Sequence, residues 1–174
     1  MKKQSQLLLL FTLIVTLLAA CQQAGQSPSK QDTKEAVYEQ WVQRYMDELN
    51  EAYENMTDQF ISDGQGKIQV NKKLKKATKA FDRVIQKGLA HQEIPAAYQK
   101  ADEQLKTGLH SFEKGIGQVE QLLKRPDQEK LFISATHHLQ DGLQRAAAFI
   151  EEVGRIQQSN VKSLEGGLPG FFYI

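Results

Sequence analysis

The sequence predicts an all-α protein whose folded part is an up-down-up-down four-helix bundle, and three observations lead to this prediction. Apolar residues recur every three or four positions in four successive segments, which is the spacing of one face of an amphipathic helix. Glycine, proline and polar residues interrupt the pattern between these segments. No segment alternates apolar and polar residues with the period of two expected of a half-buried strand. The short connections favour antiparallel neighbours.

The first two helices are predicted over 33–61 and 69–90, separated by the glycine-containing stretch SDGQGK. The first has these residues on its apolar face: Val37, Trp41, Tyr45, Leu49, Tyr53, Met56 and Phe60. The second has these: Val70, Leu74, Ala77, Phe81, Val84 and Ile85. Each face is one stripe of an amphipathic helix, so we expect both to point into the bundle core.

The third and fourth helices are predicted to begin with a proline in the first turn, where the missing N–H is not needed. Pro95 opens the third helix, and Pro126 opens the fourth, which continues to about Gln158. The third carries these apolar residues: Tyr98, Leu105, Leu109, Phe112, Ile116, Val119 and Leu122. The fourth carries these: Leu131, Ala135, Leu139, Leu143, Ala146, Phe149, Ile150 and Val153.

These last two helices also resemble each other. The segments that begin at Ala101 and Ala135 share identical residues at six positions, at an offset of 34. That period also occurs in tetratricopeptide arrays, but each such repeat is a pair of helices. We therefore favour two neighbouring bundle helices with the same packing pattern. Three glycines on the apolar stripe, Gly108, Gly115 and Gly142, would allow these helices a close approach.

The N-terminal segment has the organisation of a secretory signal. Lys2 and Lys3 precede an uncharged, mostly aliphatic run over 7–20. This run is too short for a membrane-spanning helix, which needs about 20 apolar residues. Small residues then lead to the only cysteine of the chain, Cys21. The sequence Leu18-Ala19-Ala20-Cys21 resembles the lipobox of bacterial lipoproteins.

This resemblance implies that signal peptidase II cuts between Ala20 and Cys21. The Cys21 sulfur would become a diacylglyceryl cysteine, usually with an acylated (palmitate-type) amine. Two or more acyl chains anchor a protein stably, so we expect a lipid-anchored protein on the extracytoplasmic face of the cell membrane. The alternative is a cysteine buried in a core or lying next to an uncleaved anchor.

The predicted organisation has four parts: a signal peptide (1–20), a lipidated N-terminus with a flexible tether (21–32), the helical bundle (33–160) and a glycine-rich apolar tail (161–174). The tether is polar and has no apolar periodicity. In the tail, Phe171, Phe172 and Tyr173 are candidate contact residues, because exposed apolar clusters usually mark contact sites. They would fold back onto the bundle, insert into the outer leaflet or dock on a partner.

Charge is strongly segregated although the net charge of the chain is only +1. The stretch 32–63 has nine acidic and two basic residues, whereas 67–90 has eight basic residues and one acid. Five cations fall within about 80° of arc opposite the apolar face of the second helix: Lys72, Lys76, Lys79, Arg83 and Lys87. We expect them to form either a solvated face or a contact with anionic lipid headgroups or an anionic wall polymer.

The sequence contains no recognisable catalytic, cofactor-binding or metal-binding motif. None of the four histidines, His91, His110, His137 and His138, has the spacing of a zinc or di-iron site. There is no P-loop and no GxSxG motif. Nucleic acid is not expected as a partner, since no aromatic residues are interleaved among the lysines and the compartment disfavours it. We therefore expect neither an enzyme nor a cofactor.

Two functions stay open. The first is a lipoprotein that acts as a helical interaction or structural module at the cell envelope. The second is a lipoprotein that binds a small ligand between its helices. A tightly packed core would favour the first, and a cavity lined by His138 and the glycines would favour the second.

Replacing Cys21 with Ser should abolish lipidation and membrane retention, because the hydroxyl does not replace the thiol as the alkylation site. The measurement is incorporation of radiolabelled palmitate into the wild type and the Cys21→Ser variant, followed by membrane fractionation. Equal labelling of the two proteins would end the lipoprotein interpretation.

Overall fold

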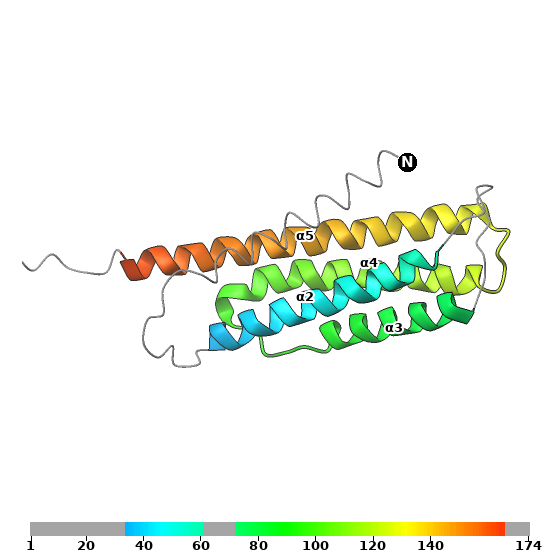
Figure 1. The fold of residues 1–174 in the computed structure, drawn as a ribbon. Coiled ribbons are helices and arrows are strands. Elements are labelled where there is room, and N and C mark those ends of the chain that lie inside the picture. Colours follow the sequence, from blue (N-terminus) through cyan, green and yellow to red (C-terminus); the bar gives the residue numbers. More distant parts are fainter. Residues whose placement is uncertain (1–33, 61–71, 166–174) are drawn as a thin grey trace, which may run out of the picture. The chain divides into compact units, whose positions relative to one another are not determined.

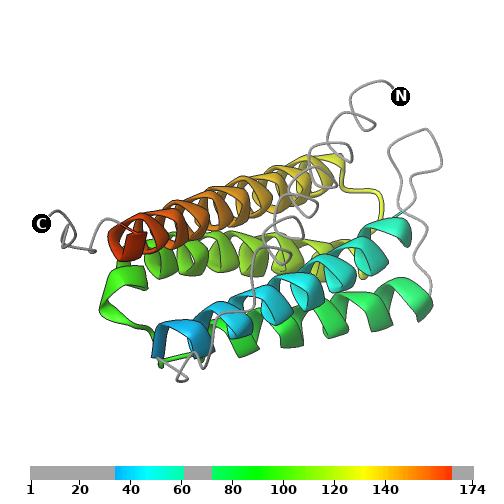
Figure 2. The same ribbon diagram turned by 60° about the vertical axis from the view of Figure 1, so that its left-hand side comes forward.

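The structure, a computed structural model, describes residues 34–60 and 72–165, of which 161–165 as backbone only. Its elements in this part are four α-helices and one short 3-10 helix: α2 (Lys34–Asp58), α3 (Lys72–Leu89), η2 (Ala96–Tyr98), α4 (Gln99–Leu122) and α5 (Glu129–Glu165). Consecutive α-helices run antiparallel, so the start of α2 and the end of α5 lie at the same end (Figures 1 and 2). The predicted all-α, up-down-up-down bundle is confirmed, and no strand occurs in the described ranges.

The core lies between the four helices, with α2 packed on α3, α3 on α4, and α4 on α5. Each helix contributes large side chains that are almost completely buried: Tyr38, Tyr45 and Met56 from α2, Leu74, Phe81 and Ile85 from α3, Leu105, Leu109 and Phe112 from α4, and Phe149 from α5. Ring contacts connect the helices through the middle of this core. Phe81 and Phe112 meet edge to face, with centroids 5.1 Å apart.

Helices α4 and α5 approach each other closely at two glycines. A Cβ atom built on Gly108 would lie 3.1 Å from the Gly142 carbonyl oxygen and 2.9 Å from the Arg145 Cβ. A Cβ atom on Gly142 would lie only 2.6 Å from two atoms of the Phe112 ring. These distances are shorter than van der Waals contact, so both positions depend on the missing side chain. The predicted close approach is confirmed.

The internal repeat corresponds to this pair of antiparallel helices. Each copy lies within one uninterrupted helix, α4 or α5, and neither copy is a helix pair of the tetratricopeptide kind. The equivalent residues Gly108 and Gly142 meet across the interface. Phe112 contacts Gly142, and the Ala146 backbone approaches Gly108 in the symmetry-equivalent position. The repeat is therefore a packing pattern used twice, once on each side of one interface.

The predicted apolar face of the first helix is partly wrong. Val37 is 51% exposed and Trp41 is half-buried, whereas their neighbours Tyr38 and Val42 are buried. The reason is geometric. A helix has 3.6 residues per turn, so a row of residues at steps of four drifts around the axis. The buried face instead follows alternating steps of three and four, and Met46 joins it.

The predicted bounds also differ at the fourth helix. Pro126 lies in a turn, and α5 begins at Glu129. At its other end α5 continues past 160, the predicted end of the bundle, to Glu165. The next two residues in the sequence are glycines, which are the residues that most often follow a helix C-terminus. Pro95 does precede helical structure, as predicted, but the first turn is η2.

Two glycine-to-alanine substitutions should change stability in opposite directions. Gly142→Ala should lower the free energy of unfolding by about 1–3 kcal/mol, because the new methyl group collides with the Phe112 ring. Gly117→Ala is the matched control: the space around it is open, and alanine has the better helix propensity by up to about 1 kcal/mol. Urea denaturation followed by circular dichroism measures both. Equal stability of the two variants would contradict the described packing.

Candidate functional site

The five cations singled out in the sequence form one exposed row along α3, here called the basic row: Lys72, Lys76, Lys79, Arg83 and Lys87. The opposite face of α3 is buried through Leu74, Phe81 and Ile85, each of which has no exposed surface. The predicted orientation is confirmed, because the helical spacing that buries the apolar residues turns the cations outward.

Only one cation of the basic row forms an ion pair among the described residues. The Lys87 Nζ contacts a carboxylate oxygen of Glu48 and so joins α3 to α2. The Arg83 Nε donates a hydrogen bond of 3.3 Å to the Lys79 carbonyl oxygen within the helix. The charges of the row are therefore mostly not neutralised within the described part of the chain.

Among the described residues, five lysines line an open depression of about 440 Å³ along the first turns of α3: Lys72, Lys73, Lys75, Lys76 and Lys79. Lysine ammonium groups are donors without acceptor capacity. A partner at this surface would therefore need anionic or hydrogen-bond-accepting groups.

Helix α2 presents a row of opposite charge, here called the acidic row: Asp47, Glu51, Glu54 and Asp58. All four are exposed. Glu54 accepts a hydrogen bond of 3.1 Å from the Asn50 side-chain nitrogen, one turn earlier. None of the four forms an ion pair with a described residue. The bundle thus has an acidic and a basic helix side by side.

At the end of the bundle where α2 begins and α3 ends, aromatic side chains pack against polar groups. The Trp41 ring stacks on the His91 ring, with centroids 3.7 Å apart and planes 8° from parallel. The Tyr45 hydroxyl donates a hydrogen bond of 3.2 Å to the Val84 carbonyl oxygen. Tyr45 also occupies the place of a side chain on Gly88, where a Cβ atom would lie 2.0 Å from its hydroxyl oxygen. Any side chain at position 88 would collide with Tyr45, so this packing requires glycine there.

Two tyrosines of this group donate to carboxylates. The Tyr38 hydroxyl lies 3.2 Å from Asp102 Oδ1, and the other carboxylate oxygen of Asp102 pairs with Lys106 at 2.9 Å. The Tyr98 hydroxyl donates to Glu39. Asp102 is 3% exposed, so Tyr38 and Lys106 compensate for the burial of its carboxylate. Sequence reasoning missed this cluster, although the spacing of Asp102 and Lys106 on one helix face was a usable signal.

Burial and the adjacent carboxylate raise the pKa of Tyr38 well above its ordinary value. Burial, followed by the hydrogen bond to Glu39, does the same to the pKa of Tyr98. Burial alone raises the pKa of Tyr53 to about 12. All three phenols therefore stay protonated at neutral pH. Tyr38 and Tyr98 act as hydrogen-bond donors to carboxylates.

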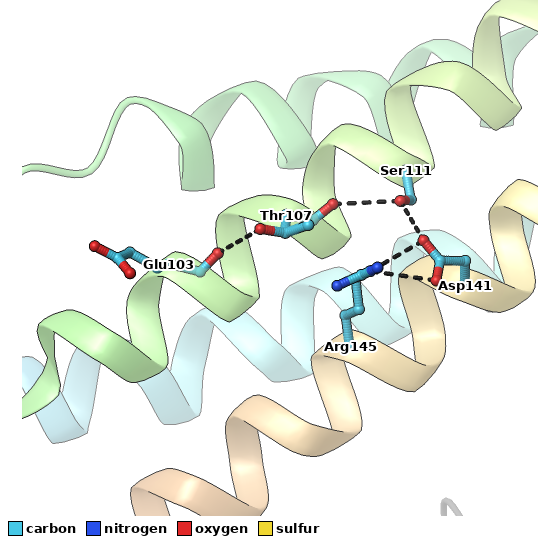
Figure 3. Close-up of polar contacts among 5 residues, drawn as sticks. All are labelled: Glu103, Thr107, Ser111, Asp141 and Arg145. Atoms are coloured by element: carbon cyan, nitrogen blue, oxygen red, sulfur yellow. Dashed lines mark hydrogen bonds and ion pairs between the residues drawn. The ribbon is translucent and has the colours of Figure 1, made fainter.

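A second polar group connects α4 to α5 beside the glycine contact (Figure 3). The Ser111 Oγ lies 2.5 Å from Asp141 Oδ2, and the Arg145 Nε lies 3.0 Å from the same oxygen. On α4, the Thr107 hydroxyl donates to the Glu103 carbonyl oxygen at 2.7 Å. The Ser111 hydrogen bond, followed by that from Arg145, lowers the pKa of Asp141. This carboxyl is thus an anion at neutral pH and cannot serve as a general acid.

The histidines contact different partners. His110 lies 2.7 Å from Glu113, whose pKa is lowered first by this contact and then by Gln86. His137 and His138 are neighbours whose rings meet edge to face, and His138 is half-buried, as expected. Within 34–60 and 72–160, no group of three or more histidine, cysteine or acidic side chains is arranged to hold a metal ion.

Several predicted site residues lie outside the described residues. They are Ala20 and Cys21 at the predicted cleavage and lipidation site, and Phe171, Phe172 and Tyr173 in the tail. In the described part of the chain, no helix is both long and apolar enough to cross a bilayer.

Replacing Ser111 with Ala should raise the pKa of Asp141 toward the ordinary aspartate value of about 3.9. A pKa that is lowered in the folded state contributes stability above the ordinary value, and this contribution is lost as the pH falls through the lower one. We expect Ser111→Ala to cost about 1 kcal/mol at pH 7 and less at pH 3. NMR titration of the Asp141 carboxyl carbon and urea denaturation measure both effects.

The control is Thr107→Val, which removes a hydroxyl that bonds only within α4. It should leave the pKa of Asp141 unchanged. A Ser111→Ala cost that is the same at pH 3 and pH 7 would show that the hydroxyl does not stabilise the Asp141 anion.

Comparison with known proteins gives no match: no family model, no curated protein and no solved structure is similar to this chain.

Proposed function

We propose that this chain is a lipid-anchored bacterial lipoprotein whose bundle is an interaction module at the extracytoplasmic face of the cell membrane. The basic row of α3 is the contact with an anionic surface of the envelope. The observation that carries the proposal is this row, because its cations are exposed on one face and only Lys87 is paired within the described residues. Each cation held near an anionic membrane contributes about 1 kcal/mol.

The packing of the bundle interior supports a role for its surface. The positions where small residues would leave room for a ligand are filled by side chains of the facing helix. Phe112 fills the place beside Gly142, and Leu139 lies 3.0 Å from a Cβ atom built on Gly115. This packing favours the interaction module over the small-ligand alternative.

The chemistry of the polar groups between the helices supports a role other than catalysis. The tyrosines beside Asp102 and Glu39 have raised pKa values and are fully used as donors. Asp141 is held as an anion by Ser111 and Arg145. Catalytic acids and bases need a pKa near the working pH. Here the pKa values of the two phenols are raised and that of Asp141 is lowered, in each case away from neutral pH.

The predicted tether supports the geometry of the contact. Its 22–32 segment reaches roughly 35–40 Å when extended, whereas the 18 residues of α3 span about 27 Å. A bundle anchored through Cys21 could therefore lie on its side, with the whole basic row against phosphate groups. Lipid headgroups and wall polymers present the same chemistry.

Neutralising the basic row should weaken binding to anionic vesicles. In residues 34–174, the triple variant Lys72→Gln, Lys76→Gln and Lys79→Gln should bind vesicles containing phosphatidylglycerol on the order of a hundredfold more weakly. Sedimentation of the vesicles at low and high salt measures the binding, and screening should reduce the wild-type affinity.

The matched control removes three exposed lysines from α4 and the following turn, Lys100→Gln, Lys114→Gln and Lys124→Gln. A parallel measurement with an isolated anionic wall polymer separates the two possible surfaces. Equal losses in both triple variants would show that only net charge matters, and the basic row would then have no specific role.

A further inference from the structure

The acidic row of α2 and the basic row of α3 form a self-complementary surface, and we infer that a second copy of this chain binds there. In the dimer, the acidic row of each copy lies on the basic row of the other. This inference rests on the described charges and their positions, and it does not depend on the lipid anchor or on the anionic surface proposed above.

The acidic row and the basic row lie on neighbouring, antiparallel helices. Helix α2 packs directly on α3, and both figures show them side by side (Figures 1 and 2). The ion pair of Glu48 and Lys87 marks the seam between them on the outside of the bundle. Glu51 follows Glu48 by three residues and Arg83 precedes Lys87 by four, so both continue along this seam.

The two rows overlap in height along the bundle axis. Glu48 lies opposite Lys87, and Tyr53 meets Phe81 with ring centroids 5.7 Å apart. Continuing this antiparallel register places Asp58 near the level of Lys76. The acidic row therefore covers the part of the bundle from Lys76 to Lys87, and Lys72 lies one turn beyond it.

Most charged side chains of both rows form no ion pair with a described residue. The Glu48–Lys87 contact is the ion pair that joins α2 to α3 in the described residues. Glu51 and Asp58 on one side, and Lys76 and Lys79 on the other, form no ion pair there although all are exposed. A partner with the reverse arrangement of charges would satisfy both rows at once.

A second copy has this arrangement under one symmetry operation. Rotation by 180° about an axis parallel to the helices turns a copy to face the first and exchanges the positions of α2 and α3. The heights along the axis do not change, so each acidic row meets a basic row at the matching level. A two-fold axis across the helices would place like charges opposite each other. The charges therefore select one symmetric, closed dimer.

The same face of α3 would then serve both the second copy and an anionic surface. Dimer formation covers the basic row, so anionic vesicles should compete with the partner copy.

Reciprocal charge reversal tests the dimer in full-length chains carrying two different C-terminal tags, in non-ionic detergent at low salt. One variant reverses α3 (Lys76→Glu, Lys79→Glu, Arg83→Glu), and the other reverses α2 (Glu51→Lys, Glu54→Lys, Asp58→Lys). Wild type should capture wild type, and about 0.5 M salt should reduce capture to background. Neither variant should capture itself, but the α3-reversed and α2-reversed chains should capture each other.

No capture of wild type at low salt, or equal self-capture by the variants, overturns the inference. Circular dichroism of both variants establishes that they are helical, and failure of two helical variants to pair with each other also overturns it. The α2-reversed chain keeps its basic row and should still bind phosphatidylglycerol vesicles. Loss of dimerisation with retained vesicle binding therefore distinguishes this inference from the proposed function.

Single cysteine substitutions give a second measurement that removes at most one charge from each chain. A chain with Glu54→Cys should form a disulfide with a separate chain carrying Lys79→Cys, since these positions are predicted to face each other. Gln144→Cys, exposed on α5, is the control, and the chain with Cys21 alone gives the background. Crosslinking of 54 to 79 no stronger than that of either position to 144 contradicts the proposed symmetry.

Discussion

The structure depends above all on the close approach of α4 and α5 at Gly108 and Gly142. The absence of two side chains brings the helix backbones together, and Phe112 then fills the space at Gly142. Helix propensity alone disfavours glycine here by about 1 kcal/mol at each position. Packing outweighs this cost, because interiors are filled to the density of a crystal and a small residue lets two backbones gain dispersion contacts.

The α2 side of the bundle is built differently. Its contacts with α3 and α4 use large aromatic side chains, among them Tyr45, which packs over Gly88. The hydroxyl groups of Tyr38 and Tyr98 donate hydrogen bonds to the carboxylates of Asp102 and Glu39. Directional hydrogen bonds at the ends of long side chains fix the position of α2 in a way that a purely apolar contact would not, since each buried polar atom needs its own partner.

The two kinds of packing use side chains between the helices and leave many charged side chains exposed on the outer surface. The raised pKa of Tyr38 keeps this interior phenol neutral, and the partly exposed Asp141 is held as an anion by Ser111 and Arg145. The outer faces of α2 and α3 are strongly charged with opposite sign, and in the described residues the ion pair of Glu48 and Lys87 joins them. A surface of this kind favours partners of complementary charge, and their affinity depends on ionic strength.

The sequence by itself determined the helical class, the order of the helices and the outward direction of the basic row, because the spacing of apolar residues within each helix contains this information. It also identified Gly108 and Gly142 as points of close approach. Only the tertiary structure decided which side of α2 is buried, that Asp102 is compensated by Tyr38 and Lys106, and that Ser111 reaches Asp141. Apart from the pair of Asp102 and Lys106, which lie one turn apart on α4, these contacts join residues far apart in the chain. The rotation of one helix against another depends on the side chains of its neighbours. The periodicity of a single helix does not encode that rotation.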